Sequence, residues 1–438
     1  MPMPYTLFLL VSPSKMYWSN VFKSAVNAIM VVSFLTACGG GGSSAPAGSS
    51  TSAAANNSGG SAPSALATLA GNVLVVTVDK GPAGNNVNRL YTDVTICQPG
   101  STTLCQTIDH VLVDTGSTGL RLLSEVVSPS LNLSNVAAAS GLPLLACARF
   151  LDNTFAWGPV VTADITLGGK AAAGVSVQLV ADPALTGLAR SCSSGTVIDT
   201  VASLGAKGIL GIGLFKEDCG ASCASVTANG IYFTCTTAAC TAAAATRATI
   251  AQQLKNPIPL FASDNNGFLV DLPAVGSAGA VSVSGSLIFG IGTQANNQVT
   301  SSRVLTTGAT GYFSTLLAGQ SLNTSFIDTG SNGLYFDSST IPTCRGGVSS
   351  SFYCPPSLLT FSATQTGTNA VSNPVGFSVD NAATLFTDPA KTVLPNLAGT
   401  IGNARTFDWG LPFFYGRRVF TGIEGQPSPV GIGPLYAF

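Results

Sequence analysis

Short apolar runs that alternate with polar residues dominate the chain from residue 66 onward, and glycine, proline, asparagine or serine bounds most of them. The clearest runs cover residues 74–78, 109–113, 164–167 and 281–284. Alternation with a period of two, rich in β-branched residues, is typical of strands with one buried face. The pattern therefore predicts a mainly β body.

One segment has a different pattern. Residues 246–254 begin at a threonine, carry an alanine-rich and glutamine-rich middle, and end just before Asn256 and Pro257. A capping residue at the start and a proline after the end favour a helix between them. We therefore expect one helix at residues 246–254.

The N-terminal segment has the pattern of a leader. An apolar run at residues 25–35 follows Lys15 and Lys23 and is too short to span a membrane. Small residues then precede Cys38, and this arrangement resembles a bacterial lipobox, which implies that Cys38 becomes the lipidated first residue of the mature chain. We predict a lipoprotein signal peptide at residues 1–37. The alternative is a signal peptide that happens to end at a buried cysteine.

Residues 38–65 contain, after Cys38, only small and polar residue types. They are predicted to form a flexible tether. The lack of an aspartate directly after Cys38 resembles the pattern of lipoproteins sorted to the outer membrane. We expect a lipid-anchored protein of the bacterial cell envelope, with no membrane-spanning helix.

The cysteines agree with export from the cytoplasm. The chain has 11, and without Cys38 an even number remains, which suggests disulfides in an oxidising compartment. The expected pairs are Cys97–Cys105, Cys219–Cys223, Cys235–Cys240, Cys344–Cys354 and Cys147–Cys192. Zinc binding is the alternative, but the spacings are irregular.

Charge is scarce and narrows the possible chemistry. Charged residues make up 8% of the chain and the formal net charge is -1, against roughly 25% charged residues in an ordinary soluble domain. Without a basic excess, nucleic acid is not an expected partner. The single histidine argues against a histidine-based metal site or proton relay. Acid–base chemistry must therefore come from a few carboxylates.

An internal repeat supplies such carboxylates. Residues 113–120 and 327–334 share the tetrapeptide Asp-Thr-Gly-Ser, each after an apolar, strand-like run. The repeated residues are Asp114, Thr115, Gly116 and Ser117 in the first copy, and Asp328, Thr329, Gly330 and Ser331 in the second. An aspartate at a strand end projects its carboxylate out of the sheet, and a glycine two residues later lets another backbone approach.

Two such loops placed face to face would bring Asp114 and Asp328 within hydrogen-bonding distance. Two like charges at that distance cannot both ionise, so the pair would hold one proton. One member could then act as a base toward a water molecule and the other as an acid toward a carbonyl group.

At this point the chain resembles the pepsin-like aspartic proteases. Beyond the tetrapeptides, residues 208–214 and 407–414 are similar to the segments that pass beside each catalytic aspartate in that family, with Gly211 and Gly410 as the crossing glycines. The resemblance implies a bilobal β fold with two pseudo-symmetric lobes, at residues 66–295 and 296–438. It also implies an Asp114–Asp328 dyad in the cleft between the lobes.

The resemblance also implies supporting roles. Thr115 and Thr329 would bind each other's loop backbones, Ser117 and Ser331 would hydrogen-bond the outer carboxylate oxygens, and Gly116 and Gly330 would bring N–H groups to the site. An extended polypeptide would bind in the cleft, and peptide-bond hydrolysis would need no metal or cofactor. We expect a monomer that contacts the membrane only through its lipid.

Two departures bear on activity. Arg121 stands where the family usually has a tryptophan. The hairpin expected to form the flap over the cleft is several residues short, and Trp157 is the best candidate for its aromatic residue. The function expected first is a membrane-anchored aspartic endopeptidase. The alternative is a catalytically silent lipoprotein that binds peptides or glycans.

Three further features are given structural roles. Asp199 and Thr200 lack the following glycine and are expected in a loop or strand. His110 is expected to be a packing or edge residue. The Arg417–Arg418 pair is expected to be solvated or to form a single ion pair.

Overall fold

The computed structural model describes residues 71–193, 195–300, 303–346 and 348–438, and Gly71–Phe438 belong to one compact unit. The predicted leader, the tether and Cys38 lie outside the described residues. Within them the chain is mainly β, as the alternating pattern predicted. No helix in this part of the chain is long and apolar enough to cross a membrane.

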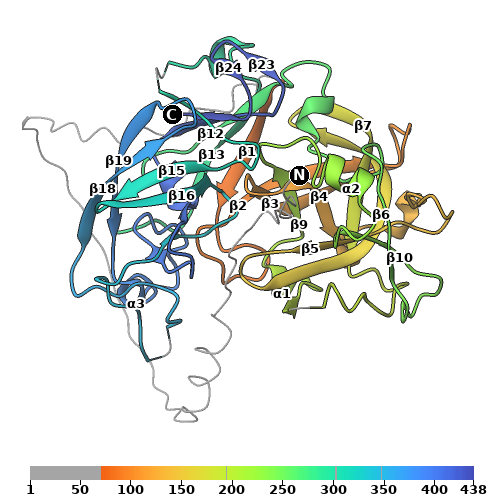
Figure 1. Cartoon of the computed structure of the whole chain (residues 1–438), viewed down its shortest axis with the longest axis horizontal. Helices are drawn as coiled ribbons and strands as arrows, with labels where there is room; N and C mark the ends of the chain where they lie inside the picture. Colours follow the sequence, from red (N-terminus) through yellow and green to blue (C-terminus); the bar gives the residue numbers. More distant parts are fainter. Residues whose placement is uncertain (1–70, 194, 301–302, 347) are drawn as a thin grey trace, which may run out of the picture. The chain divides into compact units, whose positions relative to one another are not determined.

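Strands occupy both halves of the sequence (Figure 1). Those before residue 296 are β1 (Val73–Val78), β2 (Leu90–Cys97), β3 (Cys105–Asp114), β4 (Thr118–Leu123), β5 (Leu145–Arg149), β6 (Thr154–Leu167), β7 (Lys170–Val180), β8 (Thr196–Val197), β9 (Gly208–Ile212), β10 (Tyr232–Thr234), β11 (Ala244–Ala245), β12 (Gly267–Asp271) and β13 (Val283–Phe289).

The strands after residue 296 are shorter on average. They are β14 (Val304–Thr306), β15 (Phe313–Leu317), β16 (Gln320–Ile327), β17 (Leu334–Phe336), β18 (Leu359–Thr366), β19 (Ser372–Val379), β20 (Ala398–Gly399), β21 (Phe407–Trp409), β22 (Arg418–Gly422), β23 (Pro427–Ser428), β24 (Gly431–Ile432) and β25 (Leu435–Ala437). The described residues also form three short α-helices: α1 (Val201–Leu204) and α2 (Ala221–Ser225) before residue 296, and α3 (Ala382–Leu385) after it.

One sheet is shared by the two halves of the sequence. Its order includes the run β1-β13-β12-β22-β25-β14, in which the first three strands precede residue 296 and the last three follow it. The first strand of each half, β1 or β14, lies at an outer end of this run, and two later strands of each half, β13 and β12 or β22 and β25, lie inside it. The junction is the antiparallel β12–β22 pair, from Gly267↔Gly422 to Asp271↔Arg418.

The same local topology occurs once in each half. β9 runs parallel to β3 and antiparallel to β4, and β21 runs parallel to β16 and antiparallel to β17. In each case the chain leaves a strand, turns through the Asp-Thr-Gly-Ser loop into the next strand, and later returns between the two. The strand topology around the two aspartate loops is therefore the same.

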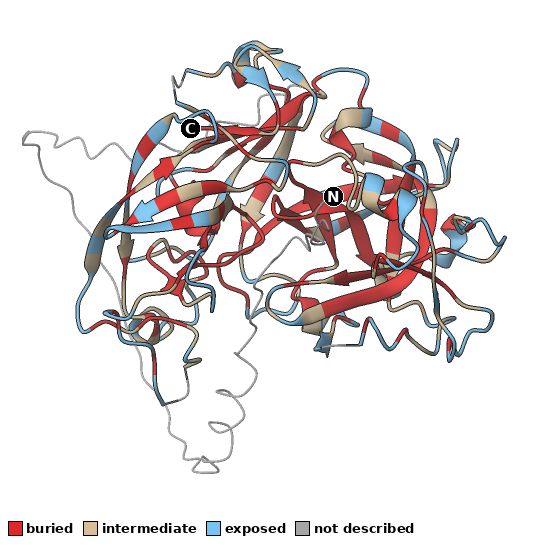
Figure 2. Ribbon diagram, in the orientation of Figure 1, coloured by how far each residue is buried: buried red, intermediate tan, exposed pale blue. Residues whose placement is uncertain are grey.

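Buried residues run through the strands of both halves (Figure 2). The largest cluster joins side chains from β1, β3 and β13 to others from β16, β17 and β21. In the second half it is strongly aromatic: the rings of Phe407 and Trp409 stack with centroids 3.9 Å apart, and Phe336 stacks on Phe407 at 4.8 Å. Burial of this apolar surface stabilises a body that has few charges to pair.

The disulfide prediction is confirmed, since all five expected cysteine pairs are bonded. The helix prediction at residues 246–254 is wrong, because the segment forms only a turn. The Gln252 side chain accepts hydrogen bonds from the Thr249 N–H and hydroxyl at 2.8 and 2.9 Å. The Leu254 N–H donates to the Tyr232 hydroxyl at 2.8 Å instead of to a helical carbonyl. A side chain three residues away and one tertiary partner thus take the place of helical hydrogen bonds.

Candidate active site

Each repeated aspartate lies where a buried strand ends. Asp114 is the last residue of β3, and Asp328 directly follows β16. The residue directly before each aspartate, Val113 or Ile327, is apolar and buried, and both aspartate side chains are fully buried. Burial of a carboxyl group is costly unless hydrogen bonds compensate for the lost water.

The two loops are joined by their threonines. The Thr115 N–H donates to the Thr329 hydroxyl at 3.1 Å, and the Thr329 N–H donates to the Thr115 hydroxyl at 3.0 Å. Each hydroxyl in turn donates to a carbonyl of the opposite strand: Thr329 to Val113 at 2.7 Å, and Thr115 to Ile327 at 3.5 Å. Four hydrogen bonds thus connect residues more than two hundred positions apart.

Each carboxylate has the same two partners in its own loop. The Gly116 N–H donates to Asp114 Oδ1 at 2.9 Å and the Ser117 hydroxyl donates to Asp114 Oδ2 at 2.6 Å. Around Asp328 the matching distances, from the Gly330 N–H and the Ser331 hydroxyl, are 2.7 and 2.7 Å. Each carboxyl group therefore accepts one backbone and one side-chain hydrogen bond from its own loop.

The two carboxyl groups face each other across the loops. A Cβ on Gly116 would lie 2.6 Å from Asp328 Cγ, and one on Gly330 would lie 2.7 Å from Asp114 Oδ1. Only glycine leaves room for the opposite carboxyl group at these positions. Burial raises the pKa of Asp328 well above its usual range, and the charges of Asp114 and Asp408 and a hydrogen bond to Asp114 add to the effect. The site therefore favours retention of a proton.

The crossing glycines lie against the two loops. Gly211 pairs with Asp114 in the β3–β9 register, and a Cβ on it would lie 2.8 Å from Ser117 Oγ. A Cβ on Gly410 would lie 3.0 Å from the Cβ of Ser331. Equivalent hydrogen bonds follow each crossing, from the Gly213 N–H to the Ser117 carbonyl at 2.8 Å and from the Leu411 N–H to the Ser331 carbonyl at 2.7 Å.

A third buried carboxyl group was missed by the sequence analysis. Asp408 lies on β21 and is fully buried. Its Oδ2 is 2.6 Å from Ser331 Oγ, so Ser331 contacts both Asp328 and Asp408. The sequence does contain a sign of it. Two residues before the crossing glycine, the first half has the apolar Ile209, whereas the second half has an acid, Asp408.

Trp157 lies in a buried cluster around the Cys147–Cys192 disulfide. Its indole N–H donates to the Gly187 carbonyl at 3.0 Å, and its ring meets Phe233 edge-on with centroids 5.6 Å apart. These contacts give the ring a packing role in that cluster. A flap role for Trp157 therefore does not enter the proposed mechanism.

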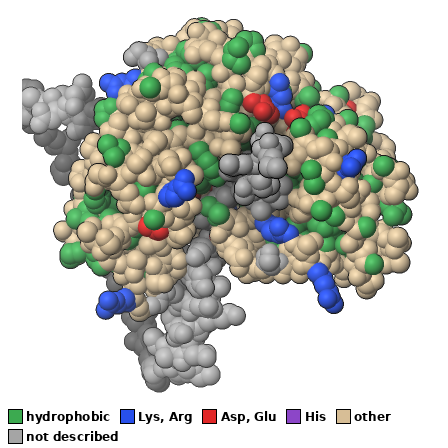
Figure 3. Space-filling view, in the orientation of Figure 1, with side chains coloured by type: hydrophobic (Ala, Val, Ile, Leu, Met, Phe, Trp, Pro, Cys, Tyr) green, Lys and Arg blue, Asp and Glu red, His purple; other side chains and the backbone are tan. Residues whose placement is uncertain are grey.

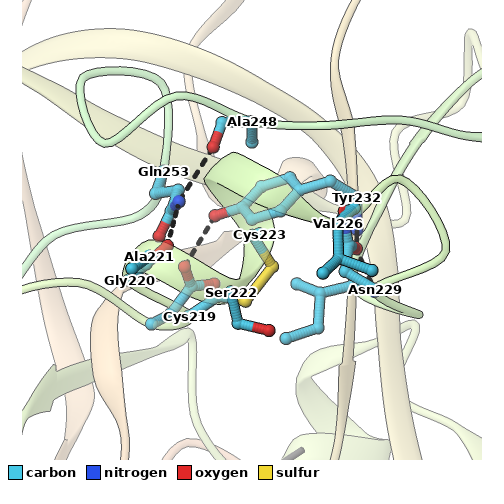
Figure 4. Close-up of a disulfide and its surroundings, with 12 residues drawn as sticks. Cys219, Gly220, Ala221, Ser222, Cys223, Val226, Asn229, Tyr232, Ala248 and Gln253 are labelled. Atoms are coloured by element: carbon cyan, nitrogen blue, oxygen red, sulfur yellow. Dashed lines mark hydrogen bonds between the residues drawn. A yellow bond between two sulfur atoms is a disulfide. The ribbon is translucent and has the colours of Figure 1, made fainter. Parts of the chain in front are cut away.

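Arg121 is buried on β4 and belongs to a polar network. Its guanidinium donates to the Thr118 carbonyl at 2.8 Å and faces the Asp218 carboxylate at 3.6 Å. The Tyr232 hydroxyl donates to Asp218 at 2.7 Å. Burial raises the pKa of Asp218 to about 6, against the lowering effect of Arg121. Figure 4 shows Tyr232 beside the Cys219–Cys223 disulfide that follows Asp218.

The remaining polar residues have structural contacts. Asp199 is exposed and Thr200 caps α1. His110 is partly exposed beside Asp109 and Asp79, and Arg418 pairs with Asp271 at 3.2 Å. Basic side chains are scattered over the face seen in Figure 3. Within the described ranges, no three histidine, cysteine or acidic residues are grouped so that they could hold a metal ion.

Comparison with known proteins gives a family without an assigned activity. No curated protein matches the chain. A model of the family DUF3443, described as a protein of unknown function, matches residues 68–438. Since the match covers most of the sequence, including both aspartate loops and both crossing segments, the chain belongs to the DUF3443 family.

Proposed function

We propose that the chain is an aspartic-type endopeptidase with a bilobal, pepsin-like arrangement of two pseudo-symmetric halves. The reciprocal threonine hydrogen bonds at 3.1 and 3.0 Å carry the proposal, because they hold two buried aspartate loops face to face. The repeated crossing of β9 and β21 between the strands on either side of each loop supports the pseudo-symmetry.

The proposed reaction uses the shared proton of Asp114 and Asp328. The ionised member takes a proton from a water molecule, whose oxygen attacks the carbonyl carbon of the peptide bond. The protonated member donates its proton to the carbonyl oxygen. When the tetrahedral intermediate collapses, the C–N bond breaks and the amine nitrogen takes the proton that the first aspartate accepted from water. A hydroxyl group of the intermediate returns its proton to the other aspartate, which restores the singly protonated pair. The hydrogen bonds from Gly116, Ser117, Gly330 and Ser331 orient the two carboxyl groups for these transfers.

Cleavage of an unfolded polypeptide at acidic pH tests the proposal. We expect a statine-type inhibitor to block cleavage, and Asp114→Asn and Asp328→Asn each to lower kcat/KM by about 10²-fold or more, the usual contribution of a positioned acid or base. Asp199→Asn is the matched control, because that carboxylate is exposed, and it should retain wild-type activity. Cleavage that survives both dyad substitutions would refute the assignment.

A binding experiment on the same variants distinguishes the peptidase from the alternative function. A catalytically silent receptor for peptides or glycans would bind its ligand without cleavage, and binding would survive loss of either carboxyl group. Isothermal titration of the statine-type inhibitor into the wild type and both asparagine variants distinguishes the two. A peptidase loses inhibitor affinity in the variants, whereas a receptor either retains it or never binds the inhibitor.

We also propose that lipid on Cys38 tethers the enzyme to the cell envelope, on the basis of the lipobox-like residues before it and the low-complexity segment after it. The wild type should partition into detergent and label with fatty acid in a bacterial host. Cys38→Ala should abolish both properties, and a fully labelled Cys38→Ala protein would refute the anchor.

A further inference from the structure

The hydroxyl group of Ser331 has two short contacts with carboxyl oxygens. Ser331 Oγ lies 2.7 Å from Asp328 Oδ2 and 2.6 Å from Asp408 Oδ2. A hydroxyl has one hydrogen, so it can donate in only one of these contacts. The other contact also needs a hydrogen between its two oxygens, and only a protonated carboxyl group can supply it. At least one of Asp328 and Asp408 therefore carries a proton.

The other carboxyl oxygens decide which one. Asp328 Oδ1 accepts the Gly330 N–H at 2.7 Å, so both oxygens of Asp328 have hydrogen-bond donors. Asp408 Oδ1 is buried and has no hydrogen-bond partner. An unpartnered buried oxygen is far costlier on a charged carboxylate than on a neutral acid, where it is a carbonyl oxygen.

The electrostatic surroundings agree. Asp408 lies on β21 between β16 and β17, and the titratable groups that face it are Asp114, Asp328, Tyr335 and Tyr436. All four are acids, and none supplies a positive charge. Burial first, and then the charge of Asp114, raises the pKa of Asp408 well above its usual range.

We propose that Asp408 is a neutral carboxylic acid that donates its proton to Ser331 Oγ and thereby commits the Ser331 hydroxyl to Asp328. Asp408 is a positioning residue: it acts on the dyad through Ser331. The first half has no equivalent, because the buried Ile209 occupies the matching position. The two carboxyl groups of the dyad therefore have unequal surroundings, because only Asp328 has a second acid behind its serine.

Infrared difference spectra of the full chain test the protonation directly, without any assumption about activity. At pH 7 the spectrum of the wild type minus Asp408→Asn should show the loss of one protonated-carboxyl band. Asp109→Asn is the control, because hydrogen bonds from Lys207 and His110 lower the pKa of Asp109 to about 2; its difference spectrum should show the loss of an ionised carboxylate. Loss of an ionised carboxylate in Asp408→Asn would overturn the proposal.

The effect on turnover rests on the proposed peptidase function and is measured separately. Asparagine mimics the neutral acid and still donates to Ser331, so Asp408→Asn should keep kcat/KM within about twofold and leave its pH profile in place. Asp408→Val removes the donor and should lower kcat/KM roughly two- to tenfold, the usual worth of one hydrogen bond. If Asp408 were ionised, Asp408→Asn would shift the basic limb to lower pH by about one unit or more, which would overturn the proposal.

The two kinds of failure are distinguishable. A wild-type protein without peptidase activity would refute the proposed function and leave the infrared result valid. If Asp408→Val does not fold, the asparagine variant still decides the protonation state.

Discussion

Threonine hydroxyl groups make the direct link between the two aspartate loops. Thr115 and Thr329 each accept the other's backbone N–H and donate to a carbonyl of the opposite strand. Both residues are almost completely buried, so no water can replace a lost partner. At this scale a single oxygen atom determines whether a buried N–H is satisfied.

Thr329→Val should therefore destabilise the protein, because it keeps the shape of the side chain but leaves the Thr115 N–H without an acceptor. We expect a loss of about 1–3 kcal/mol in the free energy of unfolding, measured by urea denaturation. Thr329→Ser keeps the hydroxyl and should recover most of that loss. Equal stabilities of the valine and serine variants would contradict the role of the hydroxyl.

A second residue-scale prediction concerns Asp218. Its pKa is raised from 3.8 to about 6 in the folded state, so the folded protein binds more protons than the unfolded chain between these values. The contribution to stability is complete below about pH 4 and is lost as the pH rises through about 6. The loss attributable to this group is roughly 3 kcal/mol.

Asp218→Asn should flatten the decline of stability between pH 4 and pH 6.5, measured as the urea midpoint at several pH values. Above about pH 6, where Asp218 is ionised, the substitution should also remove the charged partner of the buried Arg121 at 3.6 Å. A variant with the wild-type slope would show that Asp218 does not titrate in this range.

At the scale of elements, the returning strands β9 and β21 hold the loops in place. Each lies between the strand that leads into an aspartate loop and the strand that leaves it. A glycine stands at each crossing because the loop backbone is too close for a side chain. The closest approach is at Gly410, where a Cβ would lie 2.1 Å from the Gly333 carbonyl oxygen.

Gly410→Ala should consequently shift β21 against the Asp328 loop. We expect a loss of about 3 kcal/mol or more in stability, because backbone atoms rather than a flexible side chain must move. Gly276→Ala is the control, since a Cβ there would meet nothing within 4 Å, and it should change the melting temperature little. A Gly410→Ala protein with wild-type stability would contradict the close crossing.

On the scale of the whole molecule, the two halves are joined through shared strands. β12 supplies Phe268, Leu269 and Val270, all fully buried, and pairs with β22 from the other half. β14, the first strand after residue 296, pairs with β25 at the other end of the run β1-β13-β12-β22-β25-β14. Separation of the halves would expose both an unpaired strand edge and this apolar surface.

Fragments 68–295 and 296–438 are therefore expected to lack cooperative unfolding when each is produced alone, and to regain it when refolded together. Circular dichroism during thermal unfolding measures this. An isolated fragment 68–295 with a sharp transition of its own would show that the shared strands are dispensable.

The disulfides act on the whole molecule according to the length of chain that they close. Cys147–Cys192 spans 45 residues and Cys219–Cys223 spans 4. In the chain-entropy model, loss of the first costs about 4 kcal/mol and loss of the second about 2 kcal/mol. Paired serine variants, compared by urea denaturation in oxidising buffer, should follow this order, and the reverse order would contradict the model for this protein.

Much of this architecture was predictable from the sequence. Period-two alternation specified the strands, since a half-buried strand needs its apolar residues on one face. The repeated Asp-Thr-Gly-Ser identified the candidate site, since tight loops demand those residue types, and the resemblance to pepsin-like proteases added the glycines at 211 and 410. Close sequence spacing identified most cysteine pairs, and only Cys147–Cys192 had to be assigned by elimination.

The failures have a common cause. Residues 246–254 carry a helix-like pattern, but the distant Tyr232 hydroxyl accepts the Leu254 N–H, and local propensity does not include such a partner. Asp408 looked like one polar residue in an apolar segment until the fold placed it against Ser331. The ring of Trp157 lies in a cluster around Cys147 and Cys192 that the sequence pattern does not indicate.

The sequence by itself thus determined which residues could do chemistry, because strand periodicity, loop glycines and paired aspartates are local requirements. Only the tertiary structure decided which groups meet: the mutual hydrogen bonds of Thr115 and Thr329, the facing carboxyl groups of Asp114 and Asp328, and the third acid behind Ser331. These contacts join residues far apart in the chain, and their energies depend on burial, which no local pattern records.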